Sequence, residues 1–370
     1  MSSKPDLENL VNFTLRDSNL VMRLIKENEI LPLSLQISKL SACPWLRVLL
    51  GSSSPRCETL LLQRFFAANY ILPEKIFSKT NEPLKKEAKY KGGKVLDPIR
   101  GFYDTCILVL DFNSLYPSII REYNICFSTV DKEHPDAYKS KNSKENGIIP
   151  QIMTYLLEPR NEIKKQRKKL QEELKTANRN VQDKINIEIN RLNVKEKAIK
   201  LLANSMYGYL GYKNSRFQSQ ELASLITSQG RSILEDTVKT MVNMCGSESA
   251  VIYGDTDSVM VNSSVTDIDQ ANKKAEELSN AISKKYQYLK LGIDYIFLKM
   301  LLVQKKKYAA LVYKGEQTPP EFKASGLDMV RRDWSILTRK LSDFIIKQFM
   351  KDMQEKDQAI NNILTELEAI

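Results

Sequence analysis

Three aspartates in this 370-residue sequence stand where short apolar runs end. Asp111 follows the run 107–110, and Asp255 and Asp257 follow the run 251–253. Runs of this length and β-branched content predict buried strands, so each aspartate is delivered to the rim of a cleft. Two such strands in one sheet could hold a pair of hard cations, as phosphoryl or nucleotidyl transfer requires. A single Asp-Thr-Asp turn is more often a tight turn whose aspartate caps the backbone, but Asp111 at the matching position favours the metal hypothesis.

A third string, KLLANSMYG at 200–208, lies on a predicted helix between the two aspartate strings. Helical spacing places Lys200, Asn204 and Tyr207 on one stripe, which offers charge for phosphates and a ring to stack near a base. Arg160 and Lys164, also four residues apart, could face the same pocket and donate to phosphate oxygens. The segment 160–200 holds thirteen Lys or Arg against six Asp or Glu. Taken alone, such a run is usually a solvated helix face, so this stripe is weak support by itself.

Composition limits the kind of chemistry. The net charge is +11, which suits a polyanionic partner, although many basic proteins bind no nucleic acid. The five cysteines form no CxxC pair, so neither a zinc site nor a disulfide framework is expected, and the thiols fit a reducing compartment. His134 is the single histidine, which disfavours a Ser-His-Asp hydrolase. No apolar stretch approaches 18 residues, so we expect an intracellular, soluble protein with no membrane association.

The elements that must position these residues form a mixed helix and strand pattern. Residues 1–75 alternate short helical patterns around a loop at 44–55, and the lysine-rich stretch 81–94 is the best linker candidate. A second polar stretch covers 131–146. A hairpin of two long helices is predicted from about 150 to 208, with a break near 176–181. The expected later elements are, in order, a helix at 221–244, a strand-turn-strand around Asp255 and Asp257, a helix at 267–288, and strands at 295–303 and 308–313.

Together the three strings resemble the polymerase motifs of the family B DNA polymerases. Longer segments are similar to the alpha branch of that family, and the resemblance covers nearly the whole chain. These segments are NEILPLSLQISKLS (28–41), ILPEK (71–75), LDFNSLYPSIIREYNICFST (110–129), NSMYGYLG (204–211), KKKYAAL (305–311) and GLDMVRRDW (326–334). The resemblance implies an α+β fold, with a palm of antiparallel sheet and helices and a fingers domain made of a two-helix hairpin.

The same resemblance implies a division of the chain into domains. The expected parts are a remnant of an exonuclease-like domain with the entry to the palm (1–75), the first part of the palm (76–148), the fingers (149–208), the second part of the palm (209–340) and the start of the thumb (341–370). We expect most of the thumb, and the zinc-binding tail of the alpha branch, to be absent. The chain would then be either a fragment or a naturally reduced protein.

The resemblance also assigns metal and sugar roles. Asp111 and Asp257, with the carbonyl of Phe112, would hold two Mg²⁺ ions, and Asp255 would be a supporting carboxylate. The backbone N–H groups of Ser114 and Leu115, with the Ser114 hydroxyl, would receive the β- and γ-phosphates. Tyr116 would lie under the sugar and exclude a 2′-hydroxyl.

Further roles follow for the basic residues. The triphosphate would be bound by Arg160, Lys164, Lys200 and Asn204. The nascent base pair would lie on Tyr207 and Gly208. Lys305, Lys306, Lys307 and Tyr308 would grip the backbone of the primer–template duplex; the alternative is a solvated edge strand guarded by lysines. Pro159 departs from the family pattern and could change the aim of Arg160 through a helix kink.

The resulting expectation is a nuclear DNA-directed DNA polymerase core of the replication-initiation type, acting on deoxynucleoside triphosphates and a DNA or RNA-primed template. Its partners would be primase and an accessory subunit, although their usual docking tail is not expected here. Proofreading is not expected, because Asp6, Glu8 and Asp17 are better explained as helix-terminal charges. The alternative is a catalytically idle DNA-binding scaffold.

Overall fold

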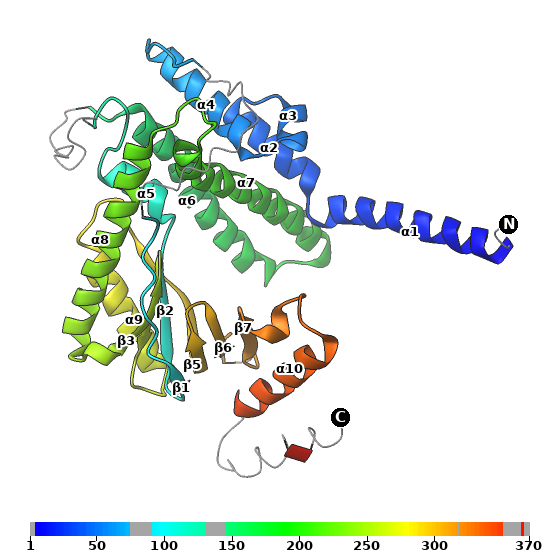
Figure 1. The fold of residues 1–370 in the computed structure, drawn as a ribbon, viewed down its shortest axis with the longest axis vertical. Helices are drawn as coiled ribbons and strands as arrows, with labels where there is room; N and C mark the ends of the chain where they lie inside the picture. The colour runs from blue at the N-terminus through cyan, green and yellow to red at the C-terminus, as the bar shows by residue number, and fades with distance from the viewer. Residues whose placement is uncertain (1–3, 75–90, 131–144, 317, 351–363, 366–370) are drawn as a thin grey trace. The chain divides into compact units, whose positions relative to one another are not determined.

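The computed structural model describes residues 4–74, 91–130, 145–316, 318–350 and 364–365 (Figure 1). The chain divides into two compact units. The first comprises residues 1–90 and 123–226, and the second comprises residues 91–122 and 227–370. Helices and one antiparallel sheet make up the described part, which confirms the mixed fold class predicted from the sequence.

The second unit is built on a seven-stranded sheet in the order β3-β4-β2-β5-β6-β7, with β1 paired to β5. All of its strand pairs are antiparallel. The strands are β1 (Gly101–Tyr103), β2 (Ile107–Phe112), β3 (Val251–Asp255), β4 (Ser258–Asn262), β5 (Leu291–Gln304), β6 (Lys307–Val312) and β7 (Glu321–Ser325). The first four residues of β2 are buried, because this strand lies between β4 and β5 in the middle of the sheet.

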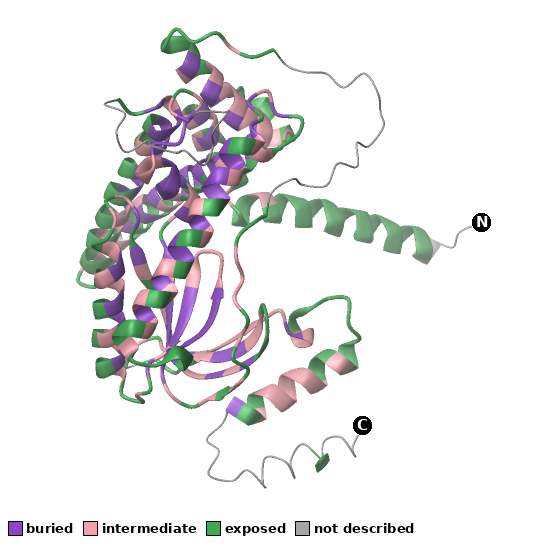
Figure 2. Cartoon of the chain, turned by 60° about the vertical axis from the view of Figure 1, so that its left-hand side comes forward, coloured by how far each residue is buried: buried purple, intermediate pink, exposed green. Residues whose placement is uncertain are grey.

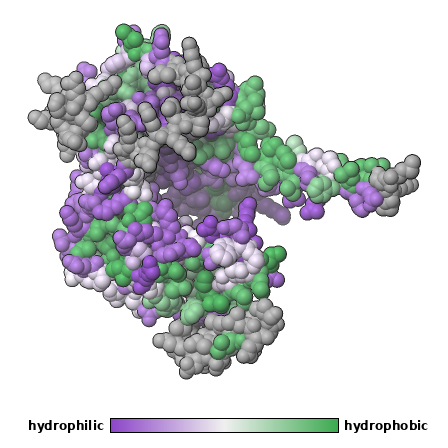
Figure 3. All heavy atoms as spheres, in the orientation of Figure 1, coloured by the Kyte–Doolittle hydropathy of each residue, from purple (hydrophilic) through white to green (hydrophobic). Residues whose placement is uncertain are grey.

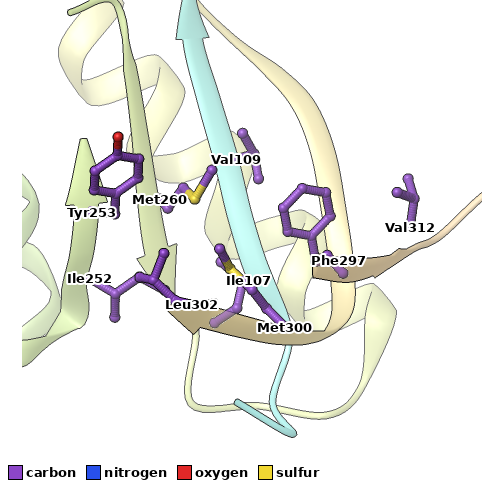
Figure 4. Close-up of a cluster of buried hydrophobic side chains, with 10 residues drawn as sticks. Ile107, Val109, Ile252, Tyr253, Met260, Phe297, Met300, Leu302 and Val312 are labelled. Atoms are coloured by element: carbon purple, nitrogen blue, oxygen red, sulfur yellow. The ribbon is translucent and has the colours of Figure 1, made fainter. Parts of the chain in front are cut away.

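Alternating residues of these strands form the core on one face of the sheet. Ile107 and Val109 of β2 pack with Phe297 of β5 and with residues of β3, β4 and β6 (Figure 4). The period of two along β2 sends its intervening residues to the opposite face. Because β2 is buried on both faces, its one charged residue lies at its end, where Asp111 is only half-buried.

Helices complete the second unit: α5 (Leu115–Glu122), most of α8 (Gln220–Cys245), α9 (Ile268–Ser283) and α10 (Ile336–Met350). The carboxylate of Asp267 caps α9 by accepting a hydrogen bond from the Gln270 N–H at 3.1 Å. Helix α9 buries Ala271, Ala275, Leu278 and Ile282, a spacing that defines one helical face, and it packs on β5 and β2. Helix α10 packs against β6.

The first unit is helical over its described residues. Its helices are α1 (Lys4–Glu27), α2 (Ile30–Ser41), α3 (Trp45–Leu50), α4 (Ser53–Ala67), α6 (Ile148–Leu174) and α7 (Arg179–Gly211). Two expectations for 1–75 were wrong. Helix α1 is one long helix, and the expected loop at 44–55 contains α3 and the start of α4. Pro44 caps α3 and Pro55 lies in the first turn of α4, where proline is tolerated because the missing N–H would have no intrahelical acceptor.

Helix α1 is exposed along its length from Asp6 to Leu24 (Figure 2). Its hydrophobic side chains, Phe13 and Met22 among them, lie on the molecular surface (Figure 3). Asp6 lies in the first turn of this helix, as expected for a helix-terminal charge, but Glu8 and Asp17 lie further along it, so for these two residues the expectation was wrong. Within the described ranges, no helix is both long enough and apolar enough to cross a bilayer.

The predicted helical hairpin corresponds to α6 and α7, which pack together and are joined by residues 175–178. Pro159 lies inside α6, yet the helix runs without a break over 27 residues. The predicted linker 81–94 contains a boundary between the two units, which falls between residues 90 and 91. Residues 81–90 of this linker, and residues 131–144 of the second polar stretch, lie outside the described residues. Residues 91–94 are described, and hydrogen bonds hold them to the second unit.

Candidate active site

Strand pairing in the second unit brings the three aspartates to one end of the sheet. In the β2–β4 register Asp111 lies opposite Ser258, and in the β3–β4 register Asp255 lies opposite the same serine. The Phe112 N–H donates to the Asp257 carbonyl at 2.8 Å, and the Asp257 N–H donates to the Asp255 carbonyl at 2.7 Å. The turn between β3 and β4 therefore lies directly beside the end of β2.

The donor set at this end of the sheet suits a hard divalent cation. All three aspartate side chains are half-buried, and the peptide of Phe112 adjoins them. Carboxylate and carbonyl oxygens are the ligands that Mg²⁺ prefers. In the described part of the chain, no group of three or more His, Cys, Asp or Glu side chains is arranged to hold a metal ion. A site here would accordingly use two carboxylates and a carbonyl, with the remaining positions left to water or substrate oxygens.

Ser114 and Leu115 lie where β2 passes into α5. Ser114 adopts a left-handed backbone conformation (φ 54°) that turns the chain from strand to helix. The first intrahelical bond runs from the Ser118 N–H to the Ser114 carbonyl at 3.0 Å, and the Ser118 hydroxyl donates to the Asn113 carbonyl at 3.1 Å. A helix begins with N–H groups that have no acceptor within the helix, and this end favours an anion. Tyr116 follows, half-buried, in the first turn.

The turn between β5 and β6 carries the predicted basic string, and each of its lysines pairs with a carboxylate. Lys305 Nζ lies 2.7 Å from Asp97 Oδ1, and Lys307 Nζ lies 3.5 Å from Asp328 Oδ1. Lys306 Nζ lies 3.4 Å from Asp255 Oδ2, so one of the predicted catalytic carboxylates has a lysine partner.

The alternative of a lysine-guarded edge strand was wrong, because β6 pairs with β5 on one side and β7 on the other. Tyr308 contributes its ring to the core of the sheet, and burial raises the pKa of its hydroxyl.

Backbone geometry fixes the position of Lys306. Its φ is 63°, and its N–H donates to the Tyr253 hydroxyl at 3.0 Å. Gly326 lies against this turn, since a Cβ at that position would come within 2.2 Å of the Lys306 carbonyl oxygen. The two contacts hold the turn that presents Lys306 to Asp255.

The hairpin of the first unit concentrates positive charge around one buried carboxylate. Glu196 of α7 lies 3.3 Å from Arg160 and 2.6 Å from Arg167, both on α6, and the Arg160 and Glu196 side chains are only 10% and 12% exposed. Burial lowers the pKa of Lys164, as do the charges of Arg160, Arg167 and Lys200, while Glu196 acts in the opposite sense. The cluster is therefore short of negative charge and suited to an anion.

The predicted stripe on α7 lies on its open side. Lys200, Asn204 and Gly208 are exposed and Tyr207 is half-buried, whereas Ile199, Ala203 and Met206 are buried on the other side. The structure thus brings the predicted residues together in two sets. Asp111 to Tyr116, Asp255, Asp257 and the 305–308 string belong to the second unit, and Arg160, Lys164, Lys200, Asn204, Tyr207 and Gly208 belong to the first.

Sequence reasoning missed Glu196 and Arg167. A signal was present, because Arg167 continues the stripe of Arg160 and Lys164 at i+7, and Glu196 lies one turn before Lys200. It also missed Gly93, whose backbone lies against Tyr116 and Thr256. No local pattern marks that contact, since the partners are distant in the sequence.

Known proteins share much of this sequence. A sequence model described as DNA polymerase family B matches residues 43–370. The chain is 40% identical to the DNA polymerase alpha catalytic subunit of Mus musculus over 94% of its own length, and 36% identical to that of Arabidopsis thaliana over 99%. The corresponding protein of Drosophila melanogaster is 38% identical over 95% of the chain. The chain spans about a quarter of the length of these curated relatives.

Proposed function

This chain belongs to DNA polymerase family B, and we propose that it is the core of a DNA-directed DNA polymerase that extends a primer by nucleotidyl transfer. One observation carries the proposal: the hydrogen bond from the Phe112 N–H to the Asp257 carbonyl joins the two strand ends that bear Asp111 and Asp257. A DNA-binding scaffold would have no need of two carboxylates on backbone segments joined in this way.

In this proposal the sheet of the second unit with its helices is the palm, and α6 with α7 forms the fingers. Residues 1–75 are the end of an exonuclease-like domain and the entry to the palm, and α10 begins the thumb. The antiparallel sheet and the long helical hairpin support this division.

Asp111, Asp257 and the Phe112 carbonyl would hold two Mg²⁺ ions, which when bound would activate the primer 3′-hydroxyl and stabilise the charge of the triphosphate. Asp255 supports this pair from the same turn. Its ion pair with Lys306 makes it less available to a metal than the other two carboxylates.

The remaining residues bind and orient the nucleotide. The N–H groups of Ser114 and Leu115 receive phosphate oxygens at the start of α5. Lys164, Lys200 and Asn204 supply hydrogen-bond donors from the hairpin. Arg160, which is held by its ion pair with Glu196, supplies a further donor. Tyr116 excludes a ribose 2′-hydroxyl by occupying its space. Tyr207 and Gly208 lie beneath the nascent pair, where the open space around Gly208 leaves room for a base.

The duplex would be held at the β5–β6 turn by residues 305–308. In that state the lysines exchange their carboxylate partners for phosphates, so binding weakens as salt rises. By analogy with the alpha catalytic subunits, we propose a nuclear enzyme of replication initiation that works without proofreading and assembles with primase and an accessory subunit.

The direct test of activity is extension of a labelled primer on a DNA template by the purified chain. Extension should require Mg²⁺ and stop when EDTA is added, and it should resume when Mg²⁺ is restored in excess. Template-dependent binding without extension at any Mg²⁺ concentration would instead identify a DNA-binding scaffold.

A further inference from the structure

Residues 91–99, here called the strap, lie along the free edge of β3 in the second unit. The Leu96 and Ile99 N–H groups donate to the carbonyls of Gly254 and Ile252, each at 2.9 Å. The Thr256 N–H donates back to the Lys94 carbonyl, also at 2.9 Å, and Val95 forms an antiparallel bridge with Asp255. The strap is therefore bonded through its backbone to the turn that carries Asp255 and Asp257.

Two side chains of α8 fix the first half of the strap. The Arg231 guanidinium donates to the carbonyls of Lys91 and Gly92, each at 2.8 Å. One turn further along α8, Glu235 accepts from the Lys94 ammonium at 2.6 Å. These contacts lie on both sides of Gly93, so its backbone has a defined position.

Gly93 has no room for a side chain. A Cβ there would lie 2.8 Å from both γ atoms of Thr256 and 3.1 Å from the Tyr116 hydroxyl. The first distance is shorter than real Cβ contacts, so the neighbours would have to move. Gly92 differs completely, since a Cβ at that position would meet nothing within 4 Å.

The ring of Tyr116 has a second glycine neighbour. A Cβ on Gly230 of α8 would lie 3.4 Å from Tyr116 Cε1, which is ordinary van der Waals contact. Tyr116 thus has a glycine of the strap near its hydroxyl and a glycine of α8 near its ring edge. Both elements are joined by Arg231, which adjoins Gly230 in the sequence.

We propose that Gly93 is a positioning residue for sugar selection: the strap sets the place of the Tyr116 hydroxyl, and with it the discrimination between deoxyribonucleotides and ribonucleotides. The inference rests on the proposed function, in which Tyr116 excludes the 2′-hydroxyl. Excluding a single hydroxyl requires the ring to be held to a fraction of an ångström, and a backbone bonded at both ends of a short segment provides that constraint.

The experiment compares Gly93→Ala with Gly92→Ala in single-nucleotide primer extension. The measured quantity is the ratio of kcat/KM for a deoxyribonucleotide to that for the matching ribonucleotide. Gly93→Ala should lower this ratio by about fivefold or more, because the added methyl group displaces the Tyr116 side chain. Gly92→Ala should change the ratio by less than about twofold. A purely structural role would lower kcat/KM for both sugars equally and leave the ratio unchanged, which would overturn the proposal.

Tyr116→Ala separates the role of the Tyr116 ring from the role of Gly93. If it leaves the ratio unchanged, the sugar-excluding role in the proposed function fails. If it lowers the ratio while Gly93→Ala matches Gly92→Ala, only the role of Gly93 fails. In a Tyr116→Phe background, which lacks the hydroxyl, the effect of Gly93→Ala on the ratio should shrink; an undiminished effect would contradict the contact.

Should Gly93→Ala not fold, Arg231→Met provides a second route. It removes both strap hydrogen bonds from the guanidinium without adding an atom near Tyr116. A loosened strap should lower the selectivity ratio by about threefold. A ratio equal to that of the unaltered chain would then overturn the proposal.

Discussion

At the scale of single residues, the lysines of the β5–β6 turn show how a basic string can have partners within the protein. Each of Lys305, Lys306 and Lys307 pairs with a carboxylate, and the partners Asp97, Asp255 and Asp328 come from separate parts of the sequence. Exposed pairs of this kind contribute little to stability. In the proposed function, phosphates of the duplex would displace these carboxylates.

The position of this turn depends on Gly326, and a matched pair of variants tests that dependence. Gly326 and Gly246 both have left-handed backbones, with φ of 63° and 68°, but a Cβ meets the Lys306 carbonyl only at Gly326. Gly246→Ala should lower the free energy of unfolding by about 1 kcal/mol, because alanine is strained in a left-handed backbone conformation. Gly326→Ala should cost about 3 kcal/mol or more, because a backbone atom must move. Urea unfolding measures both, and equal losses would contradict the close contact.

At the scale of elements, the α6–α7 hairpin gathers four basic residues, Arg160, Lys164, Arg167 and Lys200, around one carboxylate, Glu196. Glu196 of α7 pairs with Arg160 and Arg167 of α6. Of the described groups that act on the pKa of Lys164, Glu196 is the carboxylate, and Arg160, Arg167 and Lys200 are the cations. Glu196→Gln should lower the free energy of unfolding by about 2–3 kcal/mol, since it removes the negative charge that pairs with two guanidinium groups, one of them buried.

Lys164→Met is the counterpart of that variant. A lowered lysine pKa means that its charged form is less favourable in the folded than in the unfolded protein, so at pH 7 its removal should not destabilise. After allowance for solvent screening, the gain should be a few tenths of a kcal/mol. In urea unfolding at pH 7, the free energies of unfolding of the two variants should therefore change in opposite directions. A destabilised Lys164→Met would show that packing of the aliphatic part of Lys164 stabilises the fold by more than burial of its charge destabilises it.

The exposed stripe of α7 gives a kinetic prediction for the same element. Lys200→Ala should raise the KM for deoxynucleotide by roughly tenfold and lower kcat, since a charge-assisted phosphate contact both binds and orients. Lys195→Ala, at an exposed position off the stripe, serves as the control. If the two variants weakened only template binding, to a similar degree, the hairpin would be a general DNA-binding surface.

Elements with a clear period could be predicted from the sequence. The apolar run before Asp111 has no other good interpretation than a buried strand, and the pattern of α8 gives a helix within a residue of the observed ends. Residues 1–75 were less predictable, because Pro44 and Pro55 suggest a loop although each begins a helix. Residues 91–94 have the Lys-Gly composition of a linker, and only their bonds to the β3–β4 turn and to α8 reveal their role.

At the scale of the whole molecule, the residues proposed to do chemistry have local sequence signals, whereas the residues that hold them in place do not. Asp111 and Asp257 have a local signal, the end of an apolar run, and the sheet then brings them together. Glu196, Gly93 and Arg231 act through partners that are far away in the sequence or on another element, so their importance emerges only from the fold. Positioning depends on distances in space, which local patterns encode weakly.

Three isosteric substitutions test whether the adjoining ends of β2 and the β3–β4 turn form a nucleotidyl-transfer site. Asp111→Asn and Asp257→Asn should each lower primer extension by about a thousandfold while leaving duplex affinity nearly unchanged, because the lost charge acts mainly in the transition state. Asp294→Asn, on an exposed position of β5 in the same sheet, should extend like the unaltered chain. Extension within about tenfold of the unaltered chain by either of the first two variants would contradict the account.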